Sequence, residues 1–142
     1  MLNQEIKRIS HLLTETDASY HDAALKLGLS DSALKILYTI CENGEECLLS
    51  DIIHLSGVRK QTINSALRKL EDEGIVFLKP AGVRTKKVCL TDKGKETVKD
   101  TVLKVMAIEN KIFGSWERHE LDMYIELTQR YLTALREEIK EL

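Results

Sequence analysis

The sequence predicts a mainly α-helical protein with one small β hairpin near the middle of the chain. Apolar residues recur every three or four positions along most of the 142 residues, as they do on the buried face of an amphipathic helix. The period changes to alternation only around residues 75–90, where the chain's one proline also lies. An apolar content of 43% and a charged content of 31% suit a single domain over residues 1–142.

Four helices are expected before the hairpin. Glycines interrupt the apolar stripes at positions suited to helix ends, and serines precede two of the helices as N-cap residues. The expected elements are a helix over residues 4–27, a helix that Ser30 caps and Gly44 ends, an extended piece at Cys47–Leu49, a helix over 51–56 capped by Ser50, and a helix over 60–73. Gly57 separates the last two helices, because a side chain there would crowd the tight turn.

The hairpin and two further helices complete the chain. Strands are expected at Ile75–Lys79 and Lys87–Leu90, with Pro80, Ala81 and Gly82 supplying the turn. Thr91 is the expected N-cap of one continuous helix that runs to about Phe113, and a last helix follows to about Ile139.

A short helix, a glycine break, a second helix and a basic hairpin define a winged helix-turn-helix, which we expect over residues 30–91. Ile52, Val58, Ile63 and Ala66 are expected to lock its two central helices together. The flanking regions, 1–29 and 92–142, carry apolar stripes too long for so small a motif to bury, so they predict helices that pair with a second copy.

The charge distribution indicates which part of the chain meets nucleic acid. Residues 59–87 hold eight basic and three acidic residues, a net charge of +5, whereas the rest of the chain carries −7. Such a basic segment can engage phosphates on an otherwise acidic protein.

The residue types of the second helix suit base reading in the major groove, and those of the hairpin tip suit the adjacent minor groove or its phosphates. The predicted DNA contacts of the helix are Arg59, Lys60, Gln61, Thr62, Asn64, Ser65 and Arg68. Those of the wing are Arg84, Thr85, Lys86 and Lys87. A plain surface hairpin with solvated charges is the alternative for the wing alone.

Residues 48–94 resemble the multiple antibiotic resistance regulator (MarR) family, most specifically in KQTINSALRKLEDEGI at 60–75 and VCLTDKG at 88–94. The resemblance implies a dimeric transcription regulator that binds an imperfect inverted repeat in double-stranded DNA. It also implies that a small phenolic or lipophilic ligand releases the DNA. Repression of a nearby operon by promoter occlusion is the simplest outcome, and activation is the alternative. Family members usually carry Asp-x-Arg in the wing; Arg84 matches the arginine, but Gly82 replaces the aspartate.

The effector and redox predictions rest on few residues. His11, Tyr20, His21 and Tyr38 are the polar groups that a ligand pocket would use. Among the three cysteines, Cys89 is expected to face outward near Lys86 and Lys87, which makes a redox-sensing regulator one alternative. A helical dimer that acts through protein–protein contacts, with a repurposed winged helix, is another.

Other function classes find no support in the sequence. Scattered histidines and an odd cysteine count predict no metal site, disulfide framework or cofactor. No phosphate-cradling loop or nucleophile elbow indicates an enzyme. No apolar run is long enough for a membrane span, and the first residues lack a signal core, so we expect a cytoplasmic protein.

Overall fold

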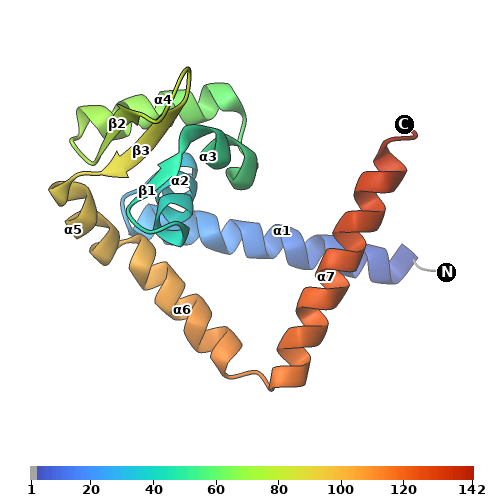
Figure 1. The fold of residues 1–142 in the computed structure, drawn as a ribbon. Helices are drawn as coiled ribbons and strands as arrows, with labels where there is room; N and C mark the ends of the chain where they lie inside the picture. The colour runs from blue at the N-terminus through green and yellow to red at the C-terminus, as the bar shows by residue number, and fades with distance from the viewer. Residues whose placement is uncertain (1–2) are drawn as a thin grey trace. The chain divides into compact units, whose positions relative to one another are not determined.

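The computed structural model describes residues 3–142, which form a mainly helical fold with a small antiparallel sheet (Figure 1). In chain order the elements are α1 (Asn3–Lys26), α2 (Asp31–Glu42), β1 (Glu46–Leu48), α3 (Leu49–Ser56), α4 (Lys60–Asp72), β2 (Val76–Pro80), β3 (Lys86–Leu90), α5 (Asp92–Asp100), α6 (Val102–Gly114) and α7 (Arg118–Ile139). The chain divides into two compact units, Met1–Val105 and Met106–Leu142. The predicted fold class is therefore confirmed.

The core of the first unit is built around α2. Its apolar face, with Ile36, Leu37 and Ile40, is fully buried, and it packs against α3 and α4. Ile52 from α3 and Ile63 from α4 are equally inaccessible, as the helix-turn-helix motif predicts, whereas Val58 and Ala66 are only partly buried. Burying these aliphatic side chains supplies most of the free energy that holds the motif together.

A three-stranded antiparallel sheet in the order β1-β3-β2 completes this unit. Glu46 and Phe77 both lie opposite Cys89, and Leu48 and Lys79 both lie opposite Lys87. The extended piece predicted beside Cys47 is therefore a true edge strand, paired to the far arm of the hairpin.

Two of the predicted helix caps are confirmed and one is wrong. The Ser30 hydroxyl accepts a hydrogen bond from the Ala33 amide at 3.1 Å, and the Thr91 hydroxyl accepts one from the Gly94 amide at 2.9 Å. Ser50 is not a cap, because α3 begins at Leu49 and its N-cap residue is Leu48, which makes no side-chain cap. Strand β1 leads directly into the helix, so no separate capping turn exists there.

Gly57 breaks the chain where predicted but for a different reason. A Cβ at this position would meet no atom within 4 Å, so crowding does not select glycine. Its φ of +68° lies in the left-handed region, which L side chains avoid because Cβ approaches the backbone carbonyl. The turn therefore depends on the backbone conformation of Gly57 and not on space around it.

The single helix predicted from Thr91 to Phe113 is wrong, because Thr101 divides it into α5 and α6. Thr101 has φ −128° and ψ −91°, which no helix tolerates, and its hydroxyl donates to the Thr97 carbonyl at 2.8 Å. No glycine or proline marks the break. Thr101 is buried, so tertiary packing sets a bend that helical periodicity could not reveal.

Long apolar stripes remain uncovered in both units. In α1 only Ala24 is buried, and in α7 no residue is. Within the second unit, Trp116 contacts Phe113 and Tyr124 edge to face, with ring centroids 5.0 and 5.4 Å apart, and the tilted rings of Phe113 and Tyr124 lie 6.0 Å apart. No helix among residues 3–142 has the length and apolarity to cross a membrane.

Candidate nucleic-acid interface

Helix α4 presents one apolar and one polar face. Its apolar face, with Ile63, Leu67 and Leu70, is buried against the lobe. The opposite face is polar, and every residue predicted to contact DNA from this helix is exposed. These residues are Arg59, Lys60, Gln61, Thr62, Asn64, Ser65 and Arg68. The helix therefore offers a continuous set of donors and acceptors to a partner.

The start of α4 leaves its backbone amides without a side-chain cap. Arg59 is the N-cap residue and makes no capping hydrogen bond. The first amides of a helix carry partial positive charge and have no partner within the helix. Together with the guanidinium of Arg59 and the ammonium of Lys60, they form a local environment suited to an anion such as phosphate.

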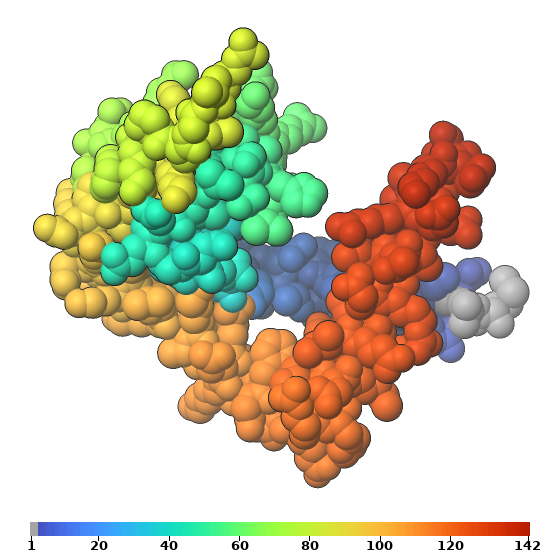
Figure 2. Space-filling model, viewed as in Figure 1, coloured from blue at the N-terminus to red at the C-terminus, as the bar shows by residue number. Residues whose placement is uncertain are grey.

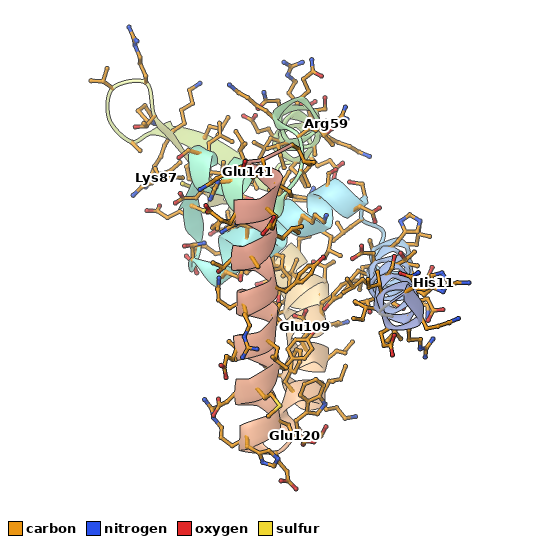
Figure 3. The ribbon with its side chains drawn as sticks, turned by 90° about the vertical axis from the view of Figure 1, so that its right-hand side faces the viewer. His11, Arg59, Lys87, Glu109, Glu120 and Glu141 are labelled. Carbon is orange, nitrogen blue, oxygen red and sulfur yellow. The ribbon has the colours of Figure 1, made fainter. Side chains whose placement is uncertain are left out.

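The cations of this surface have no acidic partner within residues 3–142. No ion pair with a carboxylate involves Arg59, Lys60 or Arg68 of α4, nor Arg84 or Lys86 of the wing. Both elements lie toward the same end of the first unit, away from α1, as the two views in Figures 1 and 3 agree. This end of the unit is therefore electropositive and open to a polyanion.

The wing consists of β2, β3 and, at its tip, a tight loop over residues 81–85 that protrudes from the first unit (Figure 2). The Thr85 hydroxyl donates to the Ala81 carbonyl at 2.9 Å, and the Ala81 amide donates back to the Thr85 carbonyl at 3.0 Å. Thr85 thus closes the loop. Arg84 has φ +63°, which is unusual for a residue with a side chain, and it is exposed to solvent.

At the root of the wing, Glu46 on β1 binds two lysines. Its Oε2 lies 2.9 Å from Lys79 Nζ, and its Oε1 accepts a hydrogen bond from Lys87 Nζ at 3.1 Å. Lys87 was predicted to contact DNA, but its ammonium is already paired. Sequence reasoning did not identify Glu46 or Lys79, because nothing local indicates that β1 lies beside the hairpin.

The hydrogen bonds from the two lysines lower the pKa of the Glu46 carboxyl to about 2, and the bond from Lys79 has the larger effect. The same contact raises the pKa of the Lys79 ammonium. A carboxyl whose pKa falls on folding stabilises the folded state above its ordinary pKa, and this contribution disappears as the pH drops toward 2. Glu46 is therefore fully ionised, and Lys79 fully charged, across the physiological range.

The expectation that Cys89 faces outward is wrong. The side chain is 4% exposed, and its thiol lies 3.6 Å from Glu46 Oε2. Burial, and then the hydrogen bond to Glu46, raises the pKa of the Cys89 thiol. Nearby Lys79 and Lys87 act in the opposite direction but are already neutralised in part by Glu46. Burial also raises the pKa of the Cys41 thiol. The pKa of the Cys47 thiol is raised by burial first and then by the nearby negative charges of Asp51 and Glu42.

Because the thiolate is the reactive form, a buried thiol of raised pKa resists oxidation. We therefore expect Cys89 to stay reduced when the native protein is treated with a modest excess of hydrogen peroxide at pH 7.5. Peptide mass spectrometry after rapid alkylation under denaturing conditions measures this. Rapid conversion of Cys89 to a sulfenic or sulfinic acid would restore the redox alternative.

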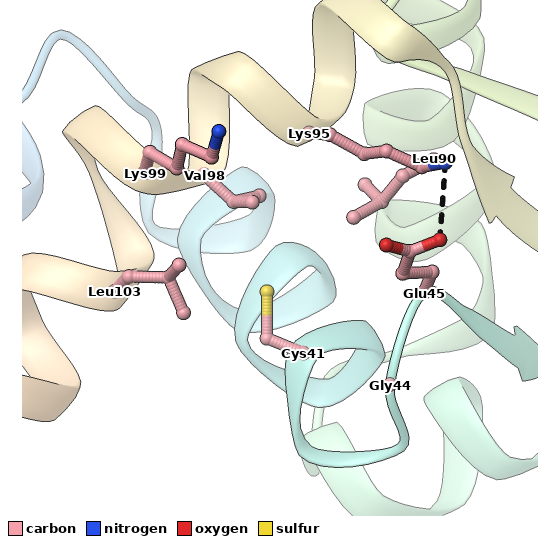
Figure 4. Close-up of a pocket in the computed structure, with 8 residues that line it drawn as sticks. All are labelled: Cys41, Gly44, Glu45, Leu90, Lys95, Val98, Lys99 and Leu103. Carbon is pink, nitrogen blue, oxygen red and sulfur yellow. Dashed lines mark ion pairs between the residues drawn. The ribbon is translucent and has the colours of Figure 1, made fainter.

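A small cavity of about 170 Å³ lies within the first unit (Figure 4). Residues of α2, β3 and α5 and the segments beside them line it, namely Cys41, Gly44, Glu45, Leu90, Lys95, Val98, Lys99 and Leu103. Glu45 and Lys95 form an ion pair there at 3.0 Å. None of the predicted effector residues His11, Tyr20 and Tyr38 lines this cavity, and His21 instead lies 2.9 Å from the Asp31 carboxylate.

In residues 3–142, no group of three or more His, Cys, Asp or Glu is placed to hold a metal ion.

Comparisons with known proteins agree on one family. A sequence model of the MarR family matches residues 27–83, which include α2, α3, α4 and β2 and end within the wing loop. The comparison with curated proteins gave no significant match.

Solved MarR-family structures superpose on nearly the whole chain. The regulator NMB1585 from Neisseria meningitidis matches with a TM-score of 0.81 at 18% identity, covering 99% of this chain and 96% of that one. AbsC from Streptomyces coelicolor matches with a TM-score of 0.74 at 16% identity, with 96% of each chain covered. BpsR from Bordetella bronchiseptica, whose DNA binding is regulated by 6-hydroxynicotinic acid, matches with a TM-score of 0.64 at 19% identity, covering 87% of this chain and 98% of that one. The segment over residues 27–83 therefore matches the MarR family in sequence, and nearly the whole chain has the fold of solved MarR-family regulators.

Proposed function

We propose that this protein is a sequence-specific DNA-binding transcription regulator. The observation that carries the proposal is the exposed face of α4, where amide, hydroxyl and guanidinium groups stand beside cations that no described acidic residue neutralises. Arginine pairs with guanine, and asparagine or glutamine with adenine, through geometry that the major groove alone offers. Arg84 and Lys86 extend the contact to the adjacent groove or its phosphates.

The regulator acts as a homodimer on an imperfect inverted repeat. Residues 1–29 and 92–142 are proposed as the dimerisation regions, and their uncovered apolar stripes support this, because a water-soluble chain seldom leaves so much apolar surface exposed. A two-fold axis would place two copies of α4 in successive major grooves, about 34–36 Å apart. Occupation of a promoter by such a dimer would repress a neighbouring operon.

Two single substitutions separate base reading from phosphate binding. We expect Arg68→Ala to cost about 1–3 kcal/mol on the preferred sequence and to relax discrimination at one base position. We expect Lys86→Ala to weaken binding to all duplexes alike and to reduce the salt slope by about 1. Titration of the chain's own upstream intergenic DNA, and of an unrelated duplex, at several salt concentrations measures both effects.

The control is Lys35→Ala, which removes an exposed cation of α2, outside both the proposed DNA contacts and the proposed dimerisation regions. It is expected to bind as the wild type does. If Arg68→Ala and Lys86→Ala also bind every duplex as the wild type does, the proposed contact surface is wrong. If the wild type shows no preference among sequences, the alternative of a protein–protein interaction module gains support.

We further propose that a small aromatic acid or a related phenolic or lipophilic compound releases the protein from DNA. The likeness to BpsR supports this class of effector. The cavity near Cys41 is smaller than the roughly 300–1,000 Å³ of ordinary ligand pockets, so we do not assign the effector to it. Salicylate, benzoate and 6-hydroxynicotinate are the probes: at least one is expected to raise the melting temperature of the free protein and lower the fraction of operator bound. No change with any of the three would contradict the proposal for this class of compound.

A further inference from the structure

One carboxylate joins all three strands at the root of the wing. Glu46 lies on β1, Lys87 on the central strand β3 and Lys79 on β2, where Lys79 and Lys87 face each other in register. Each carboxylate oxygen takes a different lysine, at 2.9 Å for Lys79 and 3.1 Å for Lys87. The sheet therefore places two cations on a single anion that comes from a distant part of the chain.

This pairing divides the basic segment into two classes. Arg84 and Lys86 at the tip have no acidic partner among residues 3–142, whereas both lysines at the root share Glu46. The three paired side chains are still 38–46% exposed, so they are not held by burial. A long lysine side chain released from Glu46 could extend into solvent and reach a phosphate beside the wing.

The pairing contributes little to stability, because exposed ion pairs gain little over hydration by water. The pairing has a larger effect on the affinity of the two lysines for DNA phosphates. A carboxylate oxygen accepts the same charge-assisted hydrogen bond from an ammonium group that a phosphate oxygen would accept. A lysine that keeps its carboxylate partner displaces no counterion from DNA and adds nothing to the salt dependence of binding.

We propose that Glu46 acts as an internal substitute for phosphate, holding Lys79 and Lys87 away from DNA so that the wing grips the duplex through its tip alone. This inference rests on the proposed DNA-binding function and assigns Glu46 a role in tuning it. Phosphate contacts carry no sequence information. Withholding two of them therefore limits attraction to unrelated DNA while leaving the base contacts of α4 unchanged.

Glu46→Gln tests the proposal, with Glu45→Gln as its matched control. Both variants remove one negative charge from adjacent residues, but Glu45 pairs with Lys95 on α5 and not with a wing lysine. We expect E46Q to make the slope of log Kobs against log salt more negative by about 1–2 per protomer and to tighten binding to an unrelated duplex at low salt. E45Q is expected to leave the slope close to the wild-type value.

Lysine variants identify the groups responsible. In the wild-type background, K79Q/K87Q is expected to leave the salt slope unchanged, because these lysines do not contact DNA there. In the E46Q background, the same pair of substitutions is expected to restore the wild-type slope. The K79Q/K87Q variant in the wild-type background tests the proposal even if E46Q folds poorly. A shallower salt slope for this variant would show that the two lysines already bind DNA in the wild type.

Three results would overturn the proposal: an unchanged or shallower slope for E46Q, an equal shift for E45Q, or a shallower slope for K79Q/K87Q in the wild-type background. Retention on phosphocellulose provides the same comparison without any DNA site, and E46Q is expected to elute at higher salt than E45Q. A wild type that binds no duplex would contradict the proposed function, while the phosphocellulose comparison would still decide whether Glu46 masks the lysines.

Discussion

Leu135→Asp is expected to convert the proposed dimer to monomers and to weaken operator binding by about 10²–10⁴-fold. Leu135 lies on the apolar stripe of α7 with Tyr124, Leu127 and Tyr131, and all four side chains are exposed in the single chain. A carboxylate placed on a surface that a second copy must cover would have to be desolvated without a partner, which is strongly unfavourable. A monomer then binds one half-site and loses the gain in affinity that two linked recognition helices provide.

Sedimentation velocity measures the oligomeric state, and fluorescence anisotropy with the operator duplex measures the affinity. Thr133→Asp is the matched control, because Thr133 is exposed on the opposite face of the same helix. It introduces the same charge into the same turn of helix, and we expect it to remain dimeric and to bind DNA normally. If Leu135→Asp stays dimeric, the stripe on α7 is not part of the interface.

Gly94→Ala is expected to lower the free energy of unfolding by about 3 kcal/mol or more. Gly94 is buried in the first turn of α5, where an added Cβ would overlap the carbonyl oxygen of Ile75 and come within 3.4 Å of Leu90. The Ile75 carbonyl also accepts hydrogen bonds from the amide and hydroxyl of Thr91, the N-cap residue of α5, so it cannot move aside without breaking these bonds. The helix would have to shift away from the sheet.

Thermal unfolding followed by circular dichroism measures this effect, and a fall of roughly 10 °C in the melting temperature corresponds to the expected loss. Gly114→Ala is the control, because a Cβ there meets nothing within 4 Å and Gly114 has no positive φ. It is expected to change the melting temperature little. Equal melting temperatures for Gly94→Ala and the wild type would contradict the close approach of α5 to Ile75.

Much of the architecture followed from local signals. The period of apolar residues located the helices, and the hydroxyl caps at Ser30 and Thr91 act over three residues, so no distant contact was needed to predict them. The polar face of α4 was predictable for the same reason, since the buried positions Ile63, Leu67 and Leu70 leave only one outward side. Local rules failed at Thr101, where a buried bend divides a helix whose periodicity continues.

The amino-acid sequence by itself determined the mainly helical fold class, the position of the winged helix-turn-helix and the exposed face of its second helix. The tertiary structure alone decided which of the basic residues are free, because Glu46 reaches Lys79 and Lys87 only through the register of β1 on β3. The same register buries Cys89, and the contact of α5 with Ile75 explains Gly94. Pairing between strands that are distant in the chain depends on the packing of the whole lobe, so the local periodicity of apolar residues cannot predict it.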